Sequence, residues 1–178
     1  MRSLPMKKLF LSVVASVLIA TGAFAADPVI TVEPAYIAPD SNFDWNGFYM
    51  GVGISGSSST GNLLTAYADF IAGINIVQDD ILFGIEGYIN GYSSNSPTSG
   101  YGVGIDTRIG YLATPDALLY LSGGGYFYDT GTQTASIGAG AEFAISDNVS
   151  LDLHYRYWGW SSTAVIGHSL SASALWHF

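Results

Sequence analysis

Residues 149–158 read VSLDLHYRYW, a stretch in which two kinds of side chain alternate. Large apolar and aromatic side chains take the odd positions, namely Leu151, Leu153, Tyr155 and Tyr157. Ionisable side chains take the even positions, namely Asp152, His154 and Arg156. Successive side chains of a β-strand point to opposite faces. This stretch therefore predicts a strand with one oily face and one charged face.

The same two-residue alternation recurs through the chain from residue 45 onward. It forms eight segments, at residues 48–55, 64–76, 81–90, 101–111, 119–128, 135–145, 149–158 and 169–178. Most are close to the roughly 9–11 residues that a tilted strand needs to cross a bilayer. Pro97 and Pro115 stand between segments, as expected because proline cannot donate to a strand ladder. The pattern predicts an all-β fold.

The N-terminus has the layout of a secretory signal peptide. Two lysines precede an apolar run at residues 9–20, and Ala23-Phe24-Ala25 forms a small-x-small cleavage site. An uncleaved membrane-anchor helix is the alternative, because the apolar run is long enough to be considered for one. We predict a signal peptide that ends at Ala25 and export through the general secretory pathway.

The segments between these patterned regions define the domains. Residues 26–44 carry three prolines and no sustained period, which favours a flexible periplasmic N-terminal linker. Residues 45–178 then form one folded domain. We expect short turns at 78–80, 113–117 and 146–148, and loops near 56–63, 91–100, 129–134 and 159–167.

The composition narrows the class of protein. Without residues 1–25, two basic residues face 14 acidic ones, a formal charge of −12, so nucleic acid is excluded as a partner. There is no cysteine, hence no disulfide framework. Only 11% of residues are charged, against about 25% in ordinary globular domains, while 49% are hydrophobic. That hydrophobicity is dispersed, because no apolar run after residue 25 approaches a membrane helix of roughly 18 residues.

Two architectures share such alternation. A soluble sandwich turns its apolar face inward, whereas a transmembrane barrel turns it toward lipid. The polar face here is mainly Gly, Ser and Tyr, which suits the narrow interior of an eight-stranded barrel better than a water-facing surface. Backbone groups in lipid must all be paired, which demands a closed sheet. We therefore predict an eight-stranded antiparallel up-and-down transmembrane β-barrel.

In such a barrel every strand charge faces the lumen, since Arg or Lys on the lipid face near mid-bilayer costs roughly 2–4 kcal/mol. The inward residues are Asp69, Glu86, Asp106, Arg108, Glu142, Asp152, His154 and Arg156. We expect them to meet at mid-height in a hydrogen-bonded network, with the arginines pairing in bidentate geometry. This lumenal charge network would plug the barrel. The alternative is a narrow ion path lined by the excess carboxylates.

Three stretches resemble a known family. They are WNGFYMGVGISG (45–56), GAGAEFAISDNVSLDLHYRYWGW (138–160) and HSLSASALWHF (168–178). The chain is similar to the small outer-membrane β-barrel proteins of Gram-negative bacteria, in particular the porin-like surface-antigen group of alphaproteobacteria, which is related in form to the OmpA membrane domain. The resemblance implies a multi-pass barrel in the bacterial outer membrane, with outer-membrane lipids and lipopolysaccharide as partners. It also implies that Trp176 and Phe178 form the signal read by the barrel-assembly machinery, with periplasmic chaperones as further partners.

The functional expectation is a structural barrel that contributes to envelope integrity and surface presentation. The alternatives are a narrow porin-like channel for ions or small solutes, and an adhesin or lipid-modifying barrel enzyme. We expect no enzyme, because His168 and Ser169 alternate in face and no serine has an aligned base. His154 with Asp152 and Glu142 could hold a metal ion, but a salt-bridged histidine is preferred, and neither a metal nor a cofactor is predicted. The oligomeric state stays open.

Overall fold

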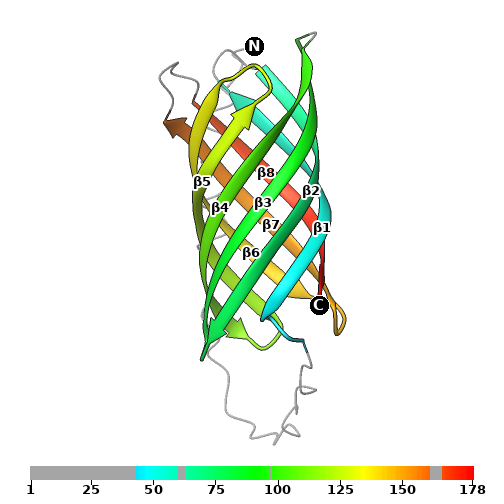
Figure 1. Ribbon diagram of the computed structural model, residues 1–178, viewed down its shortest axis with the longest axis vertical. Helices are drawn as coiled ribbons and strands as arrows, with labels where there is room; N and C mark the ends of the chain where they lie inside the picture. The colour runs from blue at the N-terminus through cyan, green and yellow to red at the C-terminus, as the bar shows by residue number, and fades with distance from the viewer. Residues whose placement is uncertain (1–42, 60–62, 97, 161–165) are drawn as a thin grey trace, which may run out of the picture. The chain divides into compact units, whose positions relative to one another are not determined.

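The computed structural model describes residues 43–59, 63–96, 98–160 and 166–178. They form eight strands: β1 (Gly47–Ser59), β2 (Leu63–Gln78), β3 (Ile81–Ser94), β4 (Ser99–Thr114), β5 (Ala117–Tyr128), β6 (Gln133–Ala144), β7 (Val149–Trp160) and β8 (Gly167–His177). Each strand pairs antiparallel with the next, and β8 pairs with β1 to close the barrel (Figure 1). The predicted fold class and topology are confirmed. The expected signal peptide (1–25) and most of the linker (26–42) lie outside the described residues.

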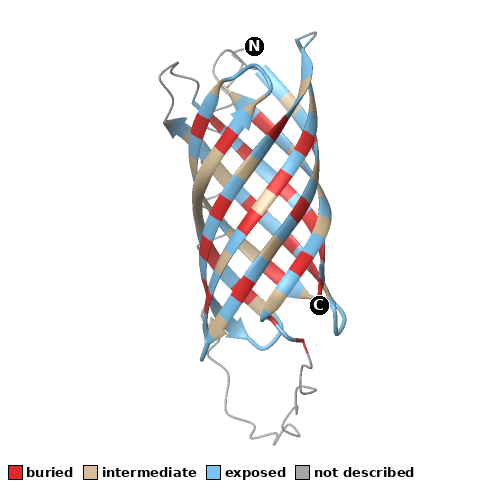
Figure 2. Ribbon diagram, in the orientation of Figure 1, coloured by how far each residue is buried: buried red, intermediate tan, exposed pale blue. Residues whose placement is uncertain are grey.

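Buried and exposed residues alternate along the strands (Figure 2). In β1, Phe48, Val52 and Ile54 are exposed while Tyr49 is buried. Across the described barrel, the large hydrophobic side chains on the outside have exposed fractions of 36–70%. Ile71 interrupts the apolar–polar pattern of β2, yet it follows the strand's alternation and faces the lumen. The outer wall is therefore oily, the reverse of a soluble sandwich.

The strands run further than the sequence indicated. The predicted loops include residues 56–59, 91–94 and 159–160, which instead continue β1, β3 and β7. Residues 56–59 and 91–94 are rich in Gly and Ser and lack large outward side chains, so they carry no apolar alternation, yet their backbones continue the ladder. We call this end of the barrel the loop end. The opposite, turn end has short connections, including Asp79-Asp80, where Asp79 adopts a φ of 56°.

Tyrosine rings inside the barrel lie across glycines of the neighbouring strand. Three directly paired positions show this: Tyr49 with Gly73, Tyr88 with Gly104, and Tyr120 with Gly140. A Cβ atom added to Gly140 would lie 2.3 Å from Cζ of Tyr120, well inside contact distance. Glycine at these positions makes room for the ring, so a narrow barrel accommodates large side chains.

An apolar cap closes the turn end of the lumen. Phe43 and Trp45 are buried against Leu82, Leu118 and Tyr120. The Trp45 indole donates to the carbonyl oxygen of Pro115 at 2.8 Å. Two expectations therefore need correction. Phe43, assigned to the flexible linker, packs into the barrel, and the hydrogen-bonded network does not fill the interior alone, because apolar side chains pack directly beside it, as where Tyr120 of the cap donates to Asp152.

Candidate functional site: the lumenal charge network

The eight residues predicted for the network project inward from five strands. Six are buried, namely Glu86, Asp106, Arg108, Glu142, Asp152 and His154, and two are partly buried, Asp69 and Arg156. They come from β2, β3, β4, β6 and β7. Even-numbered residues of β4 and β7 face inward, whereas in β2 the inward residues are odd-numbered. Strand alternation thus places all eight on the lumen side.

Arg108 is the centre of one cluster near the turn end. Its guanidinium donates to Glu142 Oε2 at 3.0 Å and to Asn75 Oδ1 at 2.9 and 3.2 Å. The guanidinium carbon also lies 4.6 Å from the ring centroid of Tyr49 and 5.4 Å from that of Tyr120. Hydrogen bonds at its edge and rings over its faces replace the water that a buried cation loses.

Arg156 forms a second cluster nearer the loop end. It donates through Nε to Asp106 Oδ2 at 2.9 Å, and its NH2 atom lies 3.6 Å from Glu86 Oε1. The ring centroid of Tyr88 lies 4.8 Å from the guanidinium carbon. Because Glu86 also lies 3.9 Å from Arg108, it connects the two clusters. Neither arginine makes the expected bidentate pair with one carboxylate: Arg108 divides its donors between Glu142 and Asn75, and Arg156 bonds Asp106 through Nε alone.

The histidine that contacts a carboxylate is His177, not His154. His177 Nε2 lies 3.0 Å from Glu142 Oε1, which also accepts a hydrogen bond from Ser150. His154 Nε2 instead lies 2.7 Å from Ser122 Oγ. The prediction that His154 forms a salt bridge was therefore wrong. Sequence reasoning missed His177 as a member of the network, although its position on the inward face of the last strand could have identified it.

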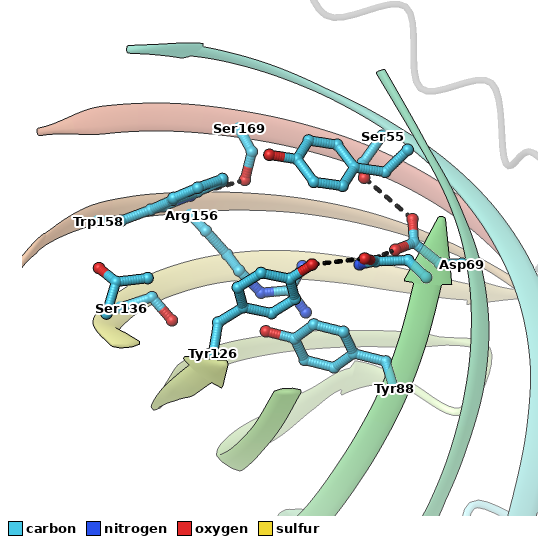
Figure 3. Close-up of a pocket in the computed structure, with 11 residues that line it drawn as sticks. Ser55, Asp69, Tyr88, Tyr126, Ser136, Arg156, Trp158 and Ser169 are labelled. Carbon is cyan, nitrogen blue, oxygen red and sulfur yellow. Dashed lines mark hydrogen bonds between the residues drawn. The ribbon is translucent and has the colours of Figure 1, made fainter. Parts of the chain in front are cut away.

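Asp152 and Asp69 sit at the margins of the network. Asp152 accepts a hydrogen bond from the Tyr120 hydroxyl at 2.7 Å. Asp69 accepts hydrogen bonds from Ser55 and Asn90, each at 2.9 Å. Figure 3 shows the Ser55–Asp69 contact beside the inward rings of β3 and β5. These two carboxylates are held by neutral donors, whereas Asp106 and Glu142 accept hydrogen bonds from guanidinium groups. Glu86 accepts a hydrogen bond from the Tyr49 hydroxyl at 2.9 Å and lies between the two guanidinium groups.

The spaces left beside the lumenal charge network are small. One cavity, bounded by Asp69, Tyr88, Tyr126, Arg156 and other side chains, measures about 30 Å³ (Figure 3). A second, beside Glu86 and His154, measures about 10 Å³. A buried water needs roughly 10–15 Å³, so these cavities have room for isolated waters only and are too small for a hydrated ion.

The other sequence-based candidates lie outside this network. Trp176 and Phe178 are exposed on the outer wall, at the end of the last strand. His168 faces outward and contacts the Tyr155 hydroxyl, whereas Ser169 is buried in the lumen. Among the described residues, no group of three or more His, Asp or Glu side chains is arranged to hold a metal ion.

Known proteins resemble the chain in structure and not in sequence. No protein-family model matches the sequence, and no curated protein matches it significantly. Neisserial surface protein A matches in structure with a TM-score of 0.57 and 21% identity, over 74% of this chain and 97% of that chain. The attachment invasion locus protein of Yersinia pestis matches with a TM-score of 0.54 and 12% identity, over 75% of this chain and 97% of that chain. A de novo designed transmembrane β-barrel matches with a TM-score of 0.52 and 20% identity, over 75% of this chain and 98% of that chain.

The chain has the fold of a small transmembrane β-barrel. That confirms the predicted architecture, with the oily face outward. At these identities the likeness concerns the fold, so the alphaproteobacterial surface-antigen group stays a prediction.

Proposed function

We propose that the chain is a structural protein of a bacterial outer membrane, exported across the inner membrane and plugged by its lumenal charge network. The observation that carries this proposal is the pair of guanidinium groups bonded across the lumen to Glu142 and Asp106. Arg108 of β4 reaches Glu142 of β6 over one intervening strand, and Arg156 of β7 reaches Asp106 of β4 over two, so the bonds tie together strands that are not neighbours. Cavities of about 10 and 30 Å³ beside the network fit a filled core at that height better than a continuous pore.

The barrel then contributes to envelope integrity and presents its loop end at the surface. Its oily wall would contact outer-membrane lipid, with lipopolysaccharide in the outer leaflet. Trp176 and Phe178, exposed at the end of β8, would be available to the assembly machinery and its chaperones. No catalytic step is proposed.

Conductance in planar bilayers tests the plug. Purified wild-type protein should insert without steady current. The double variant Arg108→Ser, Glu142→Ser removes both partners of the central ion pair and should give measurable current steps, which shows that the assay detects an opened lumen. Folding of both proteins is checked by their different migration on cold and boiled SDS gels. Steady wild-type conductance of general-porin size would refute the plug.

A narrow cation path is the second candidate. Five lumenal carboxylates face two guanidinium groups, so the interior carries excess negative charge. If wild-type protein conducts small, steady currents, their reversal potential in a salt gradient should show preference for cations. Anion preference would exclude this candidate.

A further inference from the structure

The loop end of the lumen contains a wider space than the network below it. This vestibule is a cavity of about 310 Å³, at the lower end of the range typical of small-ligand sites. Its described lining consists of four aromatic residues, nine serines and threonines, and Leu63. Asp, Glu, Lys, Arg and His are absent from that lining. A site with this composition is suited to an uncharged ligand.

The four aromatic residues form a continuous wall. Tyr67 contacts Tyr92 with ring centroids 5.8 Å apart and Trp158 with centroids 6.2 Å apart. Tyr92 contacts Tyr128 at 5.8 Å. The planes of these pairs are inclined by 47°, 66° and 82°, so the rings turn their faces in different directions and no pair forms a parallel stack.

Hydrogen bonds hold the wall in place. The Tyr92 hydroxyl donates to Asp129 Oδ1 at 3.0 Å, and the Tyr67 hydroxyl lies 3.3 Å from Ser57 Oγ. The Trp158 indole donates to Ser169 Oγ at 3.1 Å. Three of the four rings are thereby fixed at their polar edges, which lowers the entropy cost of binding against their apolar faces.

The chemistry of the lining selects among ligands. Some of the nine hydroxyl groups already hydrogen-bond within the protein, as Ser94 does with the carbonyl oxygen of Ser96 and Thr130 with Thr132. A wholly apolar ligand would remove water from the others without replacing their hydrogen bonds, at a cost for each group. A charged ligand would meet no opposite charge among the lining residues. A pyranose sugar satisfies both demands, since its C–H face packs on aromatic rings and its hydroxyls exchange hydrogen bonds with serine and threonine.

We propose that the vestibule binds a neutral pyranose, either a free sugar or the terminal sugar of a longer glycan. This site lies above the lumenal charge network, and its occupation requires no passage through the barrel. It adds a recognition function to the structural role.

Saturation-transfer NMR tests the proposal on the full chain, purified in a detergent without a sugar headgroup. The probes are the methyl glycosides of galactose, glucose and N-acetylglucosamine, with glucose 6-sulfate as the charged comparison. We expect transfer to the ring C–H protons of at least one neutral probe, and weaker transfer to the sulfate. The absence of transfer to all three neutral probes would overturn the proposal, as would stronger binding of the sulfate.

Matched tyrosine variants locate the binding. Tyr92→Ala removes one ring of the wall and should weaken binding about tenfold, the scale of one aromatic contact. Tyr101→Ala removes an outward ring that is 68% exposed and should leave binding unchanged. Thr132→Val deletes a lining hydroxyl while keeping the side chain's shape, and should weaken binding even if Tyr92→Ala fails to fold. If the folded lining variants bind the sugar as tightly as the wild type, the vestibule is not the binding site.

Oligosaccharides that end in the bound sugar distinguish a free sugar from the terminal sugar of a glycan as the ligand. Binding as tight as that of the methyl glycoside supports a glycan terminus as ligand, and loss of binding supports a free sugar. Conductance and sugar binding are separate measurements, so failure of the plug and failure of this site are distinguishable.

Discussion

The Arg108 guanidinium donates to the Glu142 carboxylate at 3.0 Å, and side-chain exposure is 2% for Arg108 and 0% for Glu142. Arg108 lies on β4 and Glu142 on β6, so the bond passes over the inward face of β5. It links two strands that the sheet's own ladder does not join. The energetic and functional consequences of the network can be tested through this contact.

Arg108→Ala should destabilise the barrel by about 3–5 kcal/mol, because it leaves the Glu142 carboxylate buried without its cation. Denaturant unfolding in detergent measures the change. Asp69→Asn is the control, since Asp69 is held by neutral donors, and it should cost less than about 1 kcal/mol. Equal losses in the two variants would show that the ion pair is not the stabilising contact.

Gly140→Ala should destabilise the barrel by about 1–3 kcal/mol, since its new Cβ would lie 2.3 Å from the Tyr120 ring. Gly123→Ala makes the same chemical change on the outer wall, where the nearest atom lies 3.8 Å away, and should be neutral or slightly stabilising. Thermal or denaturant unfolding of the two variants distinguishes the effect of the close contact with the Tyr120 ring from the effect of alanine on strand propensity. If Gly123→Ala costs as much, the close approach is not the cause.

Spin labels at Ile137 and Leu153 should be accessible to oxygen dissolved in lipid and protected from a water-soluble nickel reagent. Both side chains are outward, with exposed fractions of 67% and 51%. A label at Asp129, in the connection between β5 and β6, should show the opposite preference. Nickel accessibility at Ile137 and Leu153 would contradict a lipid-facing wall.

Phe178→Ala should lower the amount of folded barrel in cells while changing refolded stability little. Phe178 is 68% exposed, and its backbone N–H donates to the Phe48 carbonyl, a bond that alanine keeps. Cold and boiled SDS gels of membranes measure the folded fraction, and in vitro unfolding supplies the comparison. Unchanged cellular levels would remove Phe178 from the assembly signal.

Strand alternation accounts for the part of the structure that could be predicted. At Leu153 and Asp152 the pattern alone separates the outward from the inward side, because neighbouring side chains of a strand point in opposite directions. The same reasoning placed all eight charged or ionisable residues in the lumen. It failed at strand ends such as residues 56–59, where Gly and Ser pair in the ladder without large apolar side chains at alternate positions. It also failed at Phe43, which is ordered by packing against the barrel interior and not by a sequence pattern.

Alternation along the chain thus predicted the number of strands, their faces and the closed all-β class, though not the strand ends, because alternation is a local property and lipid strongly penalises exposed charge. The tertiary structure decided which inward residues meet. Arg108 contacts Glu142 and Asn75, and Glu142 contacts His177, because strand register and barrel closure set the height of each side chain in the lumen. Alternation carries no information on height, so these partners, and the sugar-sized vestibule above them, follow from the closed barrel.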